Sequence, residues 1–69
     1  MTSWLEQART TSGLAPSACA RALGVSDAAW AAWEKNPGTL TLNEVGALLR
    51  LFEGPARAIV VDALRSMLR

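Results

Sequence analysis

Glycine and proline divide this chain into short segments, and each segment has the residue spacing of a helix. Glycine marks the expected end of three of these helices, at Gly13, Gly24 and Gly54, and the run Asn36-Pro37-Gly38 stops another near Lys35. Pro16 and Pro55 lie at expected helix starts, where the missing amide hydrogen would have no helical partner anyway. Alanine and leucine are frequent and β-branched residues are sparse. The sequence therefore predicts an all-α fold of five short helices, in a single domain over residues 1–69.

Capping residues predict where the first, third and fourth helices begin, and Ser26 is the expected cap of the third. Ser3 precedes Glu6 by three residues, and Thr41 precedes Glu44 in the same way, which is the spacing of a capping box. The fourth helix is expected to end at Gly54. Its expected apolar face consists of Leu42, Val45, Leu48, Leu49 and Phe52.

Residues 16–35 have the pattern of two helices joined by a sharp turn. Ala20 is small enough to let the two helices cross closely, and Gly24 suits the turn, because its conformation is one that a side chain would resist. Trp30 and Trp33 fall on the inner face of the second of these helices. Large aromatic side chains at these positions are expected to anchor that helix to the core.

The chain resembles the XRE/Cro-like helix-turn-helix family, to which lambdoid phage repressors belong. The likeness extends from about residue 5 to residue 52, and it is carried by Ala8-Arg9, Gly13-Leu14, Ala20, Leu23-Gly24-Val25-Ser26, Trp33-Glu34, Leu42, Val45 and Leu48. The resemblance implies a five-helix, lambda-repressor-like DNA-binding domain with its helix-turn-helix at residues 16–35. It also implies that Arg9 pairs with Glu34 and ties the first helix to the third.

In that family the third helix lies in the major groove of DNA. The residues of this chain that would face the bases are Ser26, Asp27, Ala28, Ala31, Ala32 and Lys35. Base reading uses forked donors and acceptors such as Arg, Gln or Asn, whereas three alanines offer only methyl groups. Pro16 also stands where relatives often carry a polar residue that reaches a phosphate. The expected reading surface is therefore poor in the groups that DNA recognition uses.

The last helix, expected at residues 55–68, carries more apolar side chains than one core contact requires. We expect a second copy to cover part of this helix, because two-fold dimers are the commonest oligomers. The predicted homodimer surface consists of Val60, Val61, Leu64 and Leu68. The alternative is a well-buried terminal helix with one stray valine. Arg57, Arg65 and Arg69 line its outer side, either as a solvated face or as an auxiliary phosphate contact.

Composition argues against several classes of function. The chain has seven Lys or Arg, six acidic residues and no histidine, so its net charge of +1 is only a faint basic footprint for a nucleic-acid binder. Nothing in it has the spacing of a metal site or a catalytic group, so we expect no enzyme activity and no cofactor. Cys19 is expected to be a core residue in a reducing cytoplasm. The longest apolar run is too short to span a membrane, so we expect no membrane association.

Two functions from different classes remain open at this stage. The first is a sequence-specific, DNA-binding transcriptional regulator of the Cro/repressor type that binds double-stranded DNA as a dimer. The second is a helix-turn-helix scaffold that no longer reads DNA and binds a protein partner, as a phage or host modulator would. The family resemblance favours the first function, and the alanines of the expected reading surface favour the second.

Overall fold

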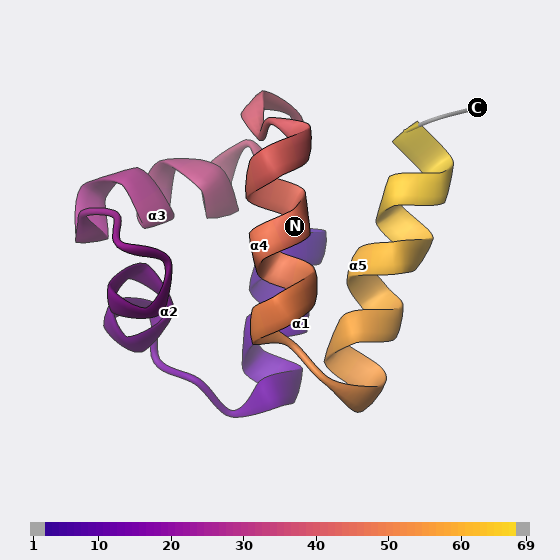
Figure 1. Ribbon diagram of the computed structural model, residues 1–69, viewed down its shortest axis with the longest axis horizontal. Helices are drawn as coiled ribbons and strands as arrows, with labels where there is room; N and C mark the ends of the chain where they lie inside the picture. The colour runs from indigo at the N-terminus through magenta and orange to yellow at the C-terminus, as the bar shows by residue number, and fades with distance from the viewer. Residues whose placement is uncertain (1–2, 68–69) are drawn as a thin grey trace.

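Five α-helices account for most of residues 3–67, the part of the chain that the computed structural model describes, and this part contains no β-strand. The helices are α1 (Trp4–Ser12), α2 (Pro16–Leu23), α3 (Asp27–Lys35), α4 (Leu42–Leu51) and α5 (Gly54–Met67), as Figure 1 shows. A single 3-10 turn, η1 (Pro37–Thr39), follows α3. The predicted all-helical fold with five helices is confirmed. No helix within the described range is long and apolar enough to cross a bilayer.

The helix starts follow the caps that the sequence predicts, although at Ser3 only the serine half of the predicted capping box is formed. The Ser3 hydroxyl accepts a hydrogen bond from the Glu6 amide at 3.2 Å, and the Ser26 hydroxyl accepts one from the Ala29 amide at 3.1 Å. At the start of α4 the capping box is complete. The Thr41 hydroxyl accepts from the Glu44 amide, and the Glu44 carboxylate accepts from the Thr41 amide. These bonds satisfy amides that have no partner within the helix.

The helix ends agree with the sequence at two glycines and differ at a third. Gly13 and Gly24 have φ values of 77° and 70°, a left-handed conformation that costs glycine little. The expected end of the fourth helix at Gly54 was wrong. The helix α4 stops at Leu51, because Phe52 turns into extended backbone with ψ 144°, and this turn directs its ring into the core. Gly54 instead opens α5.

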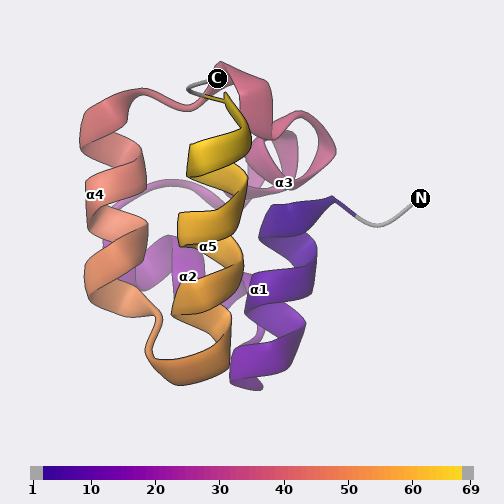
Figure 2. The same ribbon diagram turned by 90° about the vertical axis from the view of Figure 1, so that its right-hand side faces the viewer.

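The helices fall into two groups. In Figure 1, α1, α4 and α5 run alongside one another, and α2 and α3 lie together on one side of them. Figure 2 shows the same arrangement turned by 90° about the vertical axis, with α5 in front and α2 behind. Within the first group the most extensive contact is between α1 and α5. The helix α2 packs mainly against α3. The outer side of α5 therefore faces away from α2 and α3.

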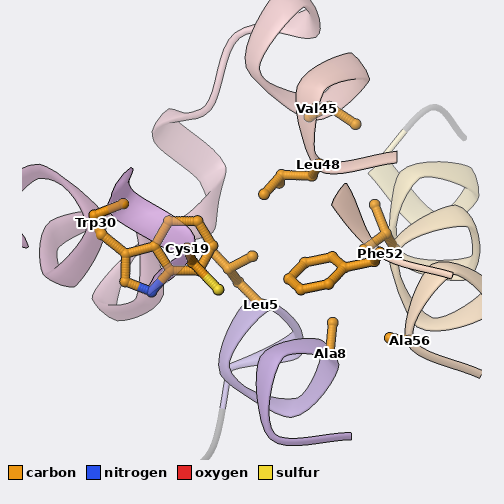
Figure 3. Packing of buried hydrophobic residues seen from close by; sticks show 10 residues of the cluster. Leu5, Ala8, Cys19, Trp30, Val45, Leu48, Phe52 and Ala56 are labelled. Atoms are coloured by element: carbon orange, nitrogen blue, oxygen red, sulfur yellow. The ribbon is translucent and has the colours of Figure 1, made fainter. Parts of the chain in front are cut away.

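One apolar cluster joins all five helices. Its buried members are Leu5, Ala8, Cys19, Ala20, Trp30, Val45, Leu48, Phe52, Ala56 and Val60, and Figure 3 shows the Phe52 ring lying between the side chains of α1 and α4. Cys19 belongs to this core, as predicted. Leu42 does not, because it is the first residue of α4 and is 75% exposed, one turn before the cluster begins at Val45. The predicted place of Leu42 in the apolar face was wrong.

The structure corrects part of the predicted dimer surface on α5. Val60 is fully buried within a single chain, so it is not available to a second copy. The reason is that Val60 and Ala56 lie on the side of α5 that belongs to the core shared with α1 and α4. Val61 and Leu64 are half-buried, and Leu68 lies outside the described residues.

Candidate nucleic-acid interface

The two helices over residues 16–35 meet at a tight three-residue connection. In Figure 1, α2 is seen nearly end-on while α3 lies across the view, so the two axes cross steeply. The Val25 amide donates to the Ala20 carbonyl at 2.9 Å and closes the turn around Gly24. Ala20 is only 1% exposed, so a larger side chain would find no room there.

Two tryptophans hold the inner side of α3. Trp30 is fully buried and is the largest side chain of the core. Trp33 is half-buried, and its ring meets that of Trp30 edge to face, with centroids 6.0 Å apart. The predicted anchoring of α3 by tryptophan is confirmed for Trp30 and is partial for Trp33.

A polar cluster ties α3 to α1. One oxygen of the Glu34 carboxylate, Oε2, accepts from Arg9 Nε at 2.5 Å and from Trp30 Nε1 at 2.6 Å. Arg9 also donates from Nη1 to the Leu14 carbonyl at 3.1 Å, in the connection between α1 and α2. The side chains of Arg9 and Glu34 are 14% and 13% exposed, so water competes weakly for these bonds. The predicted Arg9–Glu34 pair is present.

The opposite side of α3 faces solvent. Every residue that the sequence assigned to DNA is exposed there: Ser26, Asp27, Ala28, Ala31, Ala32 and Lys35. They form one continuous surface along the helix, which we call the α3 outer surface. The Ser26 hydroxyl oxygen already accepts from the Ala29 amide, and its hydrogen remains available for donation.

The charge on and beside this surface is nearly balanced. Lys35 and Asp27 are exposed at opposite ends of α3, and Arg21 is exposed on α2. Glu34 lies at the edge of the surface, but its charge is matched by Arg9. Over residues 16–35 the cations free to meet a phosphate are therefore Arg21 and Lys35.

The start of α2 offers backbone donors. Ala15 makes no side-chain capping bond, and Pro16 is exposed at the first position of α2. The amides of the first turn are thus left without a protein side chain as acceptor. Such amides, together with the helix dipole, attract an anion such as a DNA phosphate.

The side chain of Cys19 is buried and forms no disulfide. Burial raises the pKa of the Cys19 thiol, and the nearby Arg9 charge opposes this only in part, so the reactive thiolate is disfavoured. No group of three or more Cys, Asp or Glu side chains gathers within residues 3–67 to hold a metal ion.

Sequence reasoning missed the bond between Trp30 and Glu34. The two residues are four apart on one helix, a spacing at which side chains meet, so the signal was available. It also missed η1, which continues the chain for one turn where only a stop at Pro37 and Gly38 was expected.

No protein-family model, no curated protein and no solved structure matches the chain significantly.

Proposed function

We propose that the chain is a small, sequence-specific DNA-binding transcriptional regulator of the Cro/repressor type. In this proposal α2, the turn at Gly24 and α3 are a lambda-repressor-like helix-turn-helix, and α3 enters the major groove. The observation that carries it is the division of α3 into two sides. One side is fixed by Trp30 and by the Arg9–Glu34 pair, and the other is exposed along the helix.

The α3 outer surface can contact base edges in three ways. Lys35 can donate to guanine oxygen and nitrogen acceptors or to a phosphate, and Asp27 can accept from a cytosine amine. The methyl groups of the three alanines can pack against thymine methyl groups. The amides at the start of α2 can donate to a phosphate and so fix how the domain sits on the duplex.

This inventory predicts weak, salt-sensitive binding. Each phosphate that a cation neutralises contributes about −0.9 to the slope of log K against log salt, so Arg21 and Lys35 together give a slope of roughly −2. Non-specific dissociation constants of basic DNA-binding proteins are on the order of 10⁻⁴–10⁻⁶ M at physiological salt. With only two free cations over residues 16–35, we expect the weak end of that range.

The test is a titration of a fluorescently labelled random-sequence duplex, followed by anisotropy at a low and a moderate salt concentration. Binding should weaken as salt rises, and Lys35→Ala should reduce the slope by about one unit. Arg50→Ala removes the same charge from the end of α4 and serves as the control. Absence of binding at low salt, or equal effects of both variants, would contradict the proposal.

A second candidate function is docking of a protein partner on the α3 outer surface. Its specific support is the exposure of Ala28, Ala31 and Ala32 beside a single cation, which leaves a smooth surface. This candidate predicts that the immobilised chain retains a partner in the absence of DNA. Ala31→Glu should abolish that retention, and Thr11→Ala, an exposed change on α1, should preserve it.

A further inference from the structure

A shallow hollow lies between α1 and α5. The two helices lie side by side and run in opposite directions, so the start of α1 lies beside the second half of α5 (Figure 2). The hollow has a volume of about 500 Å³, and sites for small molecules have volumes of about 300–1,000 Å³. We call it the α1–α5 hollow. It shares no residue with the α3 outer surface.

The apolar lining of this hollow is held in place by the core. Trp4 and Ile59 are half-buried and pack against the buried cluster. Ala63 is half-buried beside them, and Met67 is 46% exposed at the end of α5. The hollow therefore combines an aromatic ring with aliphatic and thioether surface that stays open to solvent. A ligand with an apolar body would remove part of this surface from water.

The polar lining consists of one acid and two neutral groups. Asp62 is the charged residue among those that line the hollow, and Gln7 and Ser66 are the neutral ones. Within residues 3–67 the single ion pair is Arg9–Glu34, so Asp62 has no ion-pair partner in this part of the chain. Two other hollows of the molecule are lined by arginine side chains instead. The α1–α5 hollow therefore favours a cation over an anion.

We propose that the α1–α5 hollow binds a small organic cation, an ammonium group carried by an aromatic body. The Asp62 carboxylate accepts from the ammonium group, and the Gln7 and Ser66 oxygens can accept from its other hydrogens. The Trp4 indole contributes apolar area and attracts a cation over its face. Because Asp62 is exposed, its charge adds only modestly to affinity, and we expect millimolar binding. The inference does not depend on DNA binding.

Two probes of the same shape test this proposal, phenethylammonium and its neutral analogue phenylethanol. Each is titrated into ¹⁵N-labelled protein at low salt and without DNA. Phenethylammonium should shift the amide signals of Gln7, Ala63 and Ser66, with saturation at millimolar concentration. Phenylethanol should bind about threefold more weakly, because it gains nothing from the carboxylate.

Charge variants identify the source of this preference. Asp62→Asn should bind the two probes equally. Arg65→Gln should strengthen the binding of phenethylammonium, because Arg65 lines the neighbouring hollow together with Asp62 and its charge opposes a cation there. Asp27→Asn is the matched control, since it makes the same change at an exposed aspartate of α3. It should keep the threefold preference.

Three results would overturn the proposal. The first is the absence of a saturable shift in the signals of the α1–α5 hollow. The second is equal binding of the two probes by the wild-type chain, and the third is a preference that survives in Asp62→Asn. Circular dichroism should show native helix content for every variant, because each change is at an exposed side chain.

Discussion

Arg9 on α1 and Glu34 on α3 form an ion pair that also engages Trp30, since one carboxylate oxygen accepts from both the guanidinium and the indole. Arg9 contacts the connection between α1 and α2 as well, through the Leu14 carbonyl. A single polar cluster therefore fixes the orientation of α3 relative to α1. Because the outer surface of α3 is the proposed contact with DNA, the cluster connects the stability of the fold to the site.

Glu34→Ala should destabilise the chain by about 2–3 kcal/mol. The change leaves a largely buried guanidinium and the Trp30 N–H without their acceptor, and unpaired buried donors are costly. Urea unfolding followed by circular dichroism measures the loss. Glu53→Ala removes an exposed carboxylate and should cost less than about 0.5 kcal/mol. Equal effects of the two changes would mean that the cluster contributes nothing beyond surface charge.

Two glycine substitutions should have opposite signs. Gly24 has φ +70°, so Gly24→Ala should destabilise the chain by about 1 kcal/mol even though the added Cβ meets no atom within 4 Å. Gly46 lies inside α4 without a positive φ, and its added Cβ is also free of contacts. Gly46→Ala should therefore stabilise the chain by up to about 1 kcal/mol. Thermal unfolding of both variants compares them directly, and a loss of stability in Gly46→Ala would contradict the helix assignment there.

Thr41→Ala should destabilise the chain by about 1 kcal/mol. The change removes the hydroxyl that accepts from the Glu44 amide and opens the capping box of α4. Thr11→Ala is the control, because Thr11 is exposed within α1 and alanine is the better helix former. Chemical unfolding should separate the two variants. If the Thr41 variant were as stable as the control, the cap would contribute nothing to the free energy of unfolding.

The buried thiol predicts a loss of stability at alkaline pH. The pKa of Cys19 is raised by burial above its ordinary value of 9.0, so the unfolded chain releases this proton at a lower pH than the folded chain does. The folded state then binds more protons, and stability falls as pH rises above about 9. Cys19→Ala should lack this part of the decline when unfolding is measured from pH 8 to 10.5. Parallel curves for the two proteins would rule out a titrating buried thiol.

The helices and most of their ends could be predicted from sequence because the signals are local. The Ser26 and Thr41 caps depend on residues within one turn, and Gly13 and Gly24 adopt the conformation that glycine alone takes without cost. The burial of Trp30 followed from helical spacing in the same way.

The errors arose where the answer depends on packing between helices. Val60 was assigned to a dimer surface, because apolar spacing alone cannot distinguish a face covered by α1 and α4 from one covered by a second copy. Leu42 has the correct spacing for the core, but it lies at the first turn of α4, before the buried cluster begins.

The most direct test of the central claim is to map the chain surface that a duplex contacts. In ¹⁵N-labelled protein titrated with a short duplex at low salt, the amide signals of residues 17–18 and 26–35 should shift together. Signals of the exposed residues of α5 should stay in place. Shifts confined to α5, or none at all, would contradict the proposal that α3 enters the major groove.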